Sequence, residues 1–221
     1  MVILAISDLH GNRRALDRIL EQSGPCDMIL LAGDLTHFGS GRDVDPLIER
    51  CREKSPIVYA VAGNCDTKEV ALRLDELGVN LAARGTVVNG VGVHGLPGIP
   101  HWRPGMYQFS EDQLRDMLEQ GWTQLESASC RITLAHAPPR NCAVDRVYWG
   151  CHVGSVALRE FIQRNQPAVV ICGHIHEGRG LASEGSTQIV NCGHGSSGFY
   201  ATITVETSSD CPSIQVALHE A

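Results

Sequence analysis

Apolar runs and amphipathic segments alternate over the first third of the chain. Residues 2–7 form a nearly continuous apolar run, which is typical of a strand buried on both faces. Residues 12–22 place apolar side chains at helical spacing. The cycle repeats, and it predicts strands at 27–32 and 56–62 and helices at 43–53 and 67–77. Such β-α-β-α repeats indicate a parallel sheet with helices on its faces.

The pattern changes after this first third. Residues 84–94 alternate about an Asn89-Gly90 pair, which predicts a hairpin with a type I′ turn. Later segments predict the following elements: loops 95–109 and 136–154, helices 110–120 and 155–165, and strands 131–135, 168–172, 187–191, 199–205 and 213–218. We therefore expect an α/β protein of two packed sheets with helices outside, in one domain covering residues 1–221.

Composition narrows the classes of function. Aromatic residues make up only 5% of the chain, so the core must rest on aliphatic side chains. The net charge of −7 has the wrong sign for a protein that holds nucleic acid through its phosphates. Nine cysteines are an odd number without a C-x-x-C pair, which favours free thiols over a disulfide framework. Residues 1–6 lack the features of a signal peptide or membrane span, so we expect a cytoplasmic protein.

Polar residues follow five of the predicted strands directly. They are Asp8 and His10, Asp34, Asn64, His136, and His174 with His176. The carboxyl ends of parallel strands meet at one edge of a sheet, where α/β proteins place their ligand sites. Any one of these motifs alone is common, and an aspartate there often caps the following helix. Five in succession, each after a predicted strand, predict a metal site.

The residue types indicate which metals. Mixed carboxylate, amide and imidazole ligands suit Mn, Fe, Zn or Ni, and we expect Mn to support activity in vitro. Seven ligands exceed the needs of one such ion but divide between two ions with a shared carboxylate. Asp34 is the expected bridge, because Gly33 lets the backbone turn tightly at the strand end. Two ions about 3.5–4 Å apart can activate a shared water and clamp a phosphoryl group.

The order of these motifs resembles that of the calcineurin-like metallophosphoesterase superfamily. The series is D-x-H at 8–10, G-D at 33–34, G-N-x-D at 63–66, His136, and G-H-x-H at 173–176. With H-V-G-S at 152–155, it is most similar to the small prokaryotic and archaeal phosphoesterases. The resemblance implies a four-layer αββα sandwich of two mixed sheets flanked by helices. It also implies a phosphoesterase in which a metal-bridging hydroxide attacks phosphorus.

The resemblance divides the ligands between the ions. Asp8, His10 and His176 would bind one ion, Asn64, His136 and His174 the other, and Asp34 both. Many members carry a histidine, poised to protonate the leaving group, where this chain has Cys65. A thiol is a poor acid for an alkoxide, so a phosphodiester or an activated monoester is the expected substrate. The G-N-C-D variant also occurs in small bacterial phosphodiesterases of the superfamily.

Other residues are candidates for contacts with a small phosphorylated substrate. We assign Asn64, Cys65, His136 and His152 to substrate binding, and Asp66 with His152 to catalysis. Additional candidates near the site are the histidines His37, His101 and His194 and the arginines Arg140, Arg146 and Arg179.

Two alternative functions remain at this stage. One is a non-catalytic scaffold with this fold, although all seven ligand positions are filled here. The other is a nuclease, against which the negative charge and the low aromatic content argue, so we expect no stable binding of nucleic acid. The oligomeric state and the physiological substrate stay open.

Overall fold

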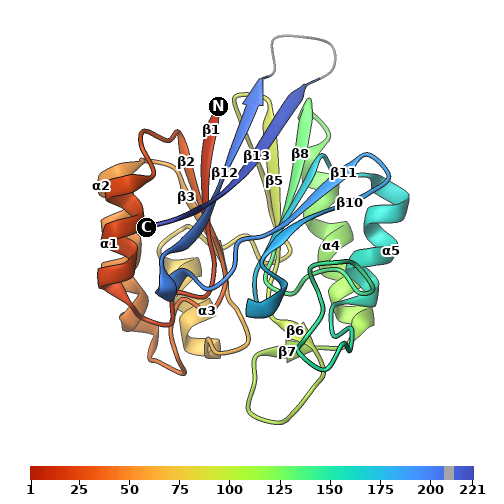
Figure 1. The fold of residues 1–221 in the computed structure, drawn as a ribbon, viewed down its shortest axis with the longest axis horizontal. Coiled ribbons are helices and arrows are strands. Elements are labelled where there is room, and N and C mark those ends of the chain that lie inside the picture. Colours follow the sequence, from red (N-terminus) through yellow and green to blue (C-terminus); the bar gives the residue numbers. More distant parts are fainter. Residues whose placement is uncertain (207–211) are drawn as a thin grey trace.

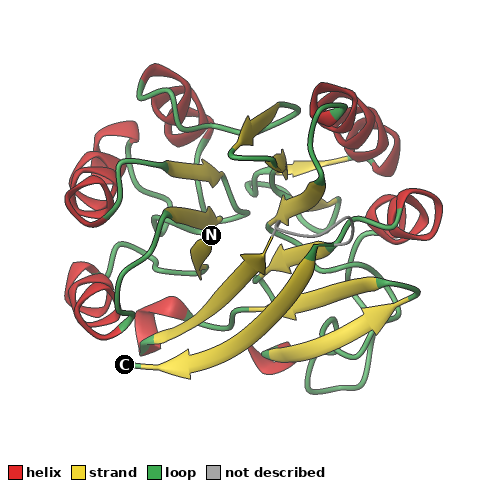
Figure 2. Ribbon diagram, turned by 90° about the horizontal axis from the view of Figure 1, so that it is seen from above, coloured by secondary structure: helices red, strands yellow, loops and turns green. Residues whose placement is uncertain are grey.

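The computed structural model describes residues 1–206 and 212–221, and it contains two large sheets packed face to face (Figures 1 and 2). The first sheet has the strand order β13-β12-β1-β2-β3 and the second has the order β10-β11-β9-β8-β5-β4. The first sheet consists of β1 (Val2–Ile6), β2 (Met28–Ala32), β3 (Val58–Val61), β12 (Phe199–Glu206) and β13 (Ser213–Glu220). The second consists of β4 (Gly85–Val88), β5 (Val91–Leu96), β8 (Cys130–Ala135), β9 (Val169–Cys172), β10 (Gly180–Glu184) and β11 (Thr187–Asn191).

Five α-helices cover the outer faces of the sheets (Figure 2). They are α1 (Arg13–Gln22), α2 (Asp45–Lys54), α3 (Lys68–Glu76), α4 (Glu111–Trp122) and α5 (Val156–Asn165). The first three pack on the first sheet and the last two on the second (Figure 1). The expected order of layers, helices-sheet-sheet-helices with both sheets mixed, is confirmed. Short β6 (Ile99–Pro100) and β7 (Gln108–Phe109) pair in parallel outside the two large sheets.

Three layers of buried aliphatic side chains hold the four structural layers together. Leu4 and Ile6 of β1 face α1–α3, whereas Ile3 and Ala5 of the same strand face the second sheet. This alternation explains the continuous apolar run at the start of the chain, because both faces of β1 are covered. Phe161 belongs to the third layer, between the second sheet and its helices. The core is therefore mainly aliphatic, as the low aromatic content predicts.

The predicted hairpin at Asn89-Gly90 is confirmed. Val88 pairs with Val91, and the two turn residues have φ angles of 51° and 81°. Both values lie in the left-handed region that a type I′ turn requires. The sequence pattern did not predict β10, whose residues 180–184 include charged and small side chains.

The strand order also departs from a simple division of the chain into halves. The C-terminal strands separate: β11 joins the second sheet beside β9, whereas β12 pairs antiparallel with β1. The first sheet is thus completed by the end of the chain. The eight cysteines among the described residues are free thiols, as expected, and Cys211 lies outside those residues. None of the described helices has the length and apolarity needed to cross a membrane.

The histidine at position 94 carries a prediction about stability. His94 is buried, its Nε2 atom lies 2.7 Å from the Thr133 hydroxyl, and its ring packs against Trp122 and Phe161. Burial lowers the pKa of His94 from 6.5 to about 3. Below pH 6.5 the unfolded chain therefore binds a proton at this imidazole, whereas the folded chain does not. Stability is fully present above pH 6.5 and declines by about 1.4 kcal/mol per pH unit between pH 6.5 and 3.

Replacement of this histidine by a side chain that does not titrate removes that loss. We expect the free energy of unfolding of His94→Gln to fall less between pH 7.5 and 5 than that of the wild type, by about 2 kcal/mol. Urea unfolding at both pH values, in the presence of a chelator, measures the difference. The exposed-site variant His101→Gln should keep the wild-type dependence. Equal pH dependence in the wild type and His94→Gln would contradict this account.

Candidate metal centre

The polar residues that follow the strands meet where the two sheets adjoin. Asp8, Asp34 and Asn64 follow β1, β2 and β3 of the first sheet, while His136 and His174 follow β8 and β9 of the second. Backbone hydrogen bonds join neighbouring loops: the Asp8 amide donates to the Gly33 carbonyl at 3.0 Å and the His10 amide to the Asp34 carbonyl at 2.9 Å. The Gly173 amide likewise donates to the His136 carbonyl at 3.0 Å. The seven predicted ligands therefore lie on loops that support one another.

Four of these seven residues have left-handed backbones. The φ angles are 56° for Asp8, 47° for His10, 50° for Asp34 and 65° for His174. Aspartate and histidine tolerate this region better than most residues, but it remains a strained conformation for a residue with a side chain. Of the nine described non-glycine residues with such backbones, these four lie at strand ends, where the loops hold their side chains in place at a cost to stability. That is the pattern of a functional site.

Asp34 lies between two groups of donor atoms. One carboxylate oxygen, Oδ1, is 3.4 Å from His136 Nε2, and the other, Oδ2, is 3.8 Å from His10 Nε2. The Cys65 amide donates to Oδ1 at 2.7 Å and fixes the orientation of the carboxylate. Gly63 permits this approach, because a Cβ atom there would lie 2.2 Å from Asp34 Oδ1. The two oxygens thus face different ligand groups, as a bridging carboxylate requires.

His136 and Asn64 form one of these groups. The Nδ1 atom of His136 lies 2.8 Å from the Ala32 carbonyl, which can only accept, so this nitrogen carries the proton. The Nε2 atom then directs a lone pair at Asn64 Oδ1, which is 2.9 Å away and is also an acceptor. Two acceptors at this distance need a cation or a proton between them. The His174 ring completes the group, with its centroid 5.2 Å from that of His136.

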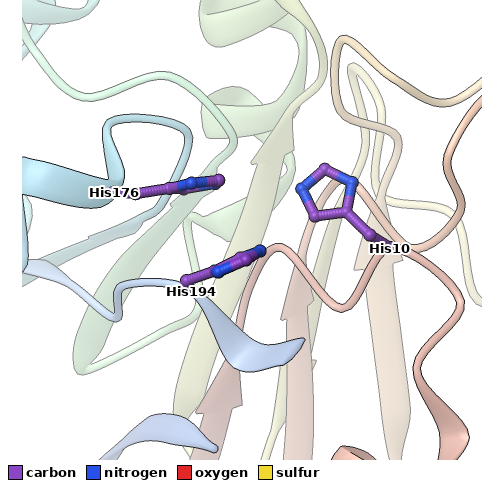
Figure 3. A group of neighbouring side chains, drawn as sticks. All are labelled: His10, His176 and His194. Carbon is purple, nitrogen blue, oxygen red and sulfur yellow. The ribbon is translucent and has the colours of Figure 1, made fainter. Parts of the chain in front are cut away.

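Asp8, His10 and His176 form the other group. Asp8 is fully buried, its Oδ1 atom lies 3.2 Å from His176 Nε2, and its Oδ2 accepts from the His174 amide at 3.0 Å. Figure 3 shows that His10 and His176 approach each other from opposite sides, with His194 beside them. The His194 ring stacks on His176 with centroids 4.1 Å apart, and Ser196 and Ser197 bind its two ring nitrogens. His194 thus contacts the ligand group through its side chain.

The charges of the site follow from burial and from the short distances between the groups. Burial and the nearby carboxylates of Asp8 and Asp66 raise the pKa of Asp34 to about 6. Burial lowers the pKa of His10 to about 4 and that of His174 to about 3, so both imidazoles are neutral at pH 7. Burial acts to raise the pKa of Asp8 as well, but hydrogen bonding to His176 holds it below the ordinary value.

These features fit divalent transition metals. Neutral imidazoles and carboxylates are the protonation states in which these side chains bind metals. The bond from His136 Nδ1 to a backbone carbonyl is the support that metal-ligating histidines commonly have. The buried Nδ1 atom of His10 lacks a hydrogen-bond partner among the described residues. Two adjacent buried carboxylates, Asp8 and Asp34, further require positive charge beside them.

Asn64, Cys65 and Asp66 are neighbours in the sequence, but their side chains make different contacts. The Asn64 amide nitrogen donates to Cys65 Sγ at 3.2 Å, which turns the amide oxygen toward His136. Burial and Asp34 raise the pKa of the Cys65 thiol, which therefore stays protonated. The Asp66 carboxylate accepts bonds from the Gly63, Leu35 and Thr36 amides at 2.8, 3.1 and 2.8 Å. Its oxygens are directed at the supporting loops and not at the ligand groups.

The loop after β8 forms a cavity of about 520 Å³ beside His174. His152 lines it together with His101 and Arg140. The Nδ1 atom of His152 is hydrogen bonded to Asp145, a fully buried carboxylate that also accepts from the Asn141, Cys142 and Gly154 amides. Arg146 donates to His152 Nε2 at 3.1 Å. Asp145 has no recognisable sequence signal, because its role depends on how the loop folds back.

Arg179 and His37 are two further candidates from the sequence, and neither lines this cavity. Arg179 turns away from the site: it donates to the His219 carbonyl at 3.0 Å and its guanidinium lies 4.3 Å from the Phe199 ring centroid. His37 packs edge-on against His10, with ring centroids 5.5 Å apart. Of the additional candidates, His37 and His194 thus contact a predicted ligand, His101 and Arg140 line the neighbouring cavity, and Arg146 binds His152.

A two-sheet α/β sandwich with carboxylate, imidazole and amide donors at the strand ends has the donor set of a metal-binding protein. The calcineurin-like phosphoesterase family matches residues 1–178, and the chain belongs to this family. Family membership makes it a metal-dependent phosphoesterase, whose substrate is a small phosphorylated molecule.

Several proteins resemble the chain. An uncharacterized protein of Methanocaldococcus jannaschii is 34% identical over 200 residues, which cover 86% of this chain and 87% of that protein. A UPF0046 protein of Caenorhabditis elegans is 24% identical over 227 residues, covering 86% of this chain and 54% of its own length. The crystal structure of a Thermus thermophilus protein superposes with a TM-score of 0.73 at 21% identity, covering 99% and 98% of the two chains. At this identity the structural match supports the fold alone.

Proposed function

We propose that the protein is a di-metal phosphoesterase that hydrolyses a phosphodiester or an activated phosphomonoester. The observation that carries this proposal is the position of Asp34, whose two oxygens face two separate groups of donor atoms. In our assignment, Asp8, His10 and His176 bind one ion, Asn64, His136 and His174 bind the other, and Asp34 binds both. Two divalent transition-metal ions, with Mn the one we expect to be active in vitro, supply a hydroxide nucleophile and neutralise phosphoryl charge when bound.

The chain's own residues then bind and orient the substrate. His136 Nε2 and Asn64 Oδ1 lie 2.9 Å apart and both accept, so we assign these two residues to substrate binding through the ion that they would hold and, for Asn64, through its amide N–H group. His152 is held by Asp145 at the side of the same cavity that His174 lines. We assign to its Nε2 atom the delivery of a proton to the leaving oxygen. Asp66 acts by positioning, because its carboxylate ties the loop of Asn64 to the loop of Asp34.

Cys65 supports the preference for a diester. Its side chain is largely buried and its raised pKa makes the thiol a weak proton donor beside the ligands. An alkoxide leaving group needs a proton, whereas an aryloxide with a low pKa leaves without one. A phosphate monoester also brings a second negative charge toward the carboxylates of Asp8 and Asp34. We therefore assign Cys65 to substrate contact and not to proton transfer.

A comparison of two chromogenic substrates tests the proposal. With Mn²⁺ bound, we expect kcat/KM for bis-p-nitrophenyl phosphate to exceed that for p-nitrophenyl phosphate by about tenfold or more. His136→Ala and chelator-treated protein should be inactive toward both. A preference for the monoester would contradict the diester assignment. Lack of hydrolysis of either ester with Mn, Fe, Zn or Ni would contradict the proposed activity itself.

A further inference from the structure

Large aromatic side chains are exposed beside the candidate site. Trp102 is 68% exposed and Trp149 is 89% exposed, although the chain contains only three tryptophans. The third, Trp122, packs against His94 and Phe161, with ring centroids at 5.5 and 5.2 Å. Exposed indole rings in a chain with so few aromatic residues are costly unless they contact a ligand or partner.

Trp102 and Trp149 come from two separate loops and line the same cavity. This cavity has a volume of about 520 Å³ and also includes His174, one of the assigned ligands. Its size is that of a site for a small organic molecule, in the range of about 300–1,000 Å³. The Arg103 guanidinium lies 5.1 Å from the Trp102 ring centroid, which restrains the indole at the mouth. The cavity therefore adjoins one assigned metal ligand, His174, and its lining includes two tryptophans from separate loops.

The lining of the cavity carries little net charge. Arg140 and Glu177 are the only lining residues with a permanent charge at neutral pH, and their charges are opposite. The remaining side chains are apolar, aromatic or imidazole. The two permanent charges of the lining itself thus give little attraction to a further phosphate, and the arginines beside it, Arg103 and Arg146, contact Trp102 and His152. The lining instead fits an uncharged, flat group with polar edges, stacked on indole and hydrogen bonded by histidine.

We propose that this cavity binds the nucleobase of a nucleoside phosphodiester, with the phosphate at the metal centre. The inference rests on the proposed function, because it identifies the group attached to the phosphate that the ions would bind. A single nucleoside is favoured over a nucleic acid chain. The net charge of −7 opposes a polyanionic strand, and the cavity has the volume of one base and sugar.

Binding of adenosine to the metal-free protein tests the cavity without any hydrolysis. Adenosine carries no phosphate, so its affinity reports the lining of the cavity without the metal centre. We expect it to quench the tryptophan fluorescence of the wild type at saturation. Trp149→Ala and Trp102→Ala should each weaken its binding by about tenfold, within the range for loss of one stacking partner. The matched control is Leu72→Ala on α3, an exposed apolar residue outside the cavity, which should bind adenosine like the wild type.

Hydrolysis of two matched diesters tests the link to the metal centre. The methyl ester of adenosine 5′-phosphate and the methyl ester of glycerol 3-phosphate both carry one negative charge and differ in the base. With Mn²⁺ bound, we expect the tryptophan variants to raise KM about tenfold for the adenosine ester and to leave the glycerol ester unchanged. Phosphorus NMR follows both reactions.

The outcomes separate this inference from the proposed activity. Equal effects of the tryptophan variants on both esters, or the absence of adenosine binding, would overturn the nucleobase site while the phosphoesterase stands. If neither ester and also no bis-p-nitrophenyl phosphate were hydrolysed, the proposed activity would be overturned. Adenosine binding could still be observed in that case. A single-stranded oligonucleotide that displaces adenosine at lower concentration than a mononucleoside diester would instead indicate a nucleic-acid surface and overturn the assignment.

Discussion

Replacement of Asp34 by asparagine is expected to abolish hydrolysis, with a loss in kcat of about 10³-fold or more. Both oxygens of this carboxylate face candidate ligands, at 3.4 Å from His136 Nε2 and 3.8 Å from His10 Nε2. An amide has one oxygen and no negative charge, so it cannot bind both ions. Metal analysis should therefore show a loss of metal from both positions and not from one.

The same substitution should stabilise the metal-free protein. Because burial and neighbouring carboxylates raise the pKa of Asp34 from 3.8 to about 6, the folded state resists its ionisation. Above pH 6 the ionised group lowers the free energy of unfolding, by roughly 2–3 kcal/mol, and asparagine removes that penalty. Its amide oxygen can still accept from the Cys65 amide. The expected result is a higher Tm for the variant at pH 8 in chelator.

The control for both measurements is Asp45→Asn on α2. Asp45 pairs with Arg73 at 2.7 Å on the outer face, remote from the ligand loops, so the variant should keep its metal and its activity. If Asp34→Asn retained two ions, Asp34 would not be the bridge. If it lost metal and also unfolded at a lower temperature than the wild type in chelator, the residue would contribute to folding and not only to metal binding.

Much of the fold follows from local patterns in the sequence. The strands that precede the site residues are short apolar runs, and the Asn89-Gly90 pair determines its turn by backbone preference alone. The order of strands does not follow from such patterns. β12 pairs with β1 across about 200 residues, and an alternating pattern near the C-terminus is compatible with either sheet. Only the packing of both sheets decides which edge is extended.

The candidate site was likewise predictable from the sequence only in part. The seven predicted ligands lie together because strand ends determine where they are placed. Features that depend on loop conformation were not predictable: the left-handed backbone of Asp8, the buried Asp145 behind His152, and the stacking of His194 on His176. Arg179 was a reasonable phosphate contact from its position after the G-H-x-H motif. Its guanidinium instead lies over the Phe199 ring and donates to the His219 carbonyl, so the cation is held by a cation–π contact and a hydrogen bond away from the site.

His152→Ala is expected to slow hydrolysis of diesters with poor leaving groups by about 10²-fold or more, the contribution of a positioned proton donor. The imidazole lines the same cavity as His174, and its contacts orient it for this role. Asp145 is fully buried and hydrogen bonded to His152 Nδ1, so the Nε2 atom exchanges the proton. Arg146 donates to that Nε2 atom at 3.1 Å, and its guanidinium must move aside when the imidazole is protonated. Cys65, which remains a protonated thiol, cannot take over this function.

The dependence on the leaving group separates proton transfer from a structural role. For methyl p-nitrophenyl phosphate the leaving group departs as a stable anion, so the loss in kcat should stay below about tenfold. For methyl phenyl phosphate, whose leaving group is more basic, the loss should be larger. Asp145→Asn should show the same trend, since a neutral amide no longer stabilises the imidazolium that would donate the proton. Unchanged metal content in both variants excludes damage to the site. Equal losses for both esters would mean that His152 only orders the loop, because a proton donor must act in proportion to the basicity of the group that leaves.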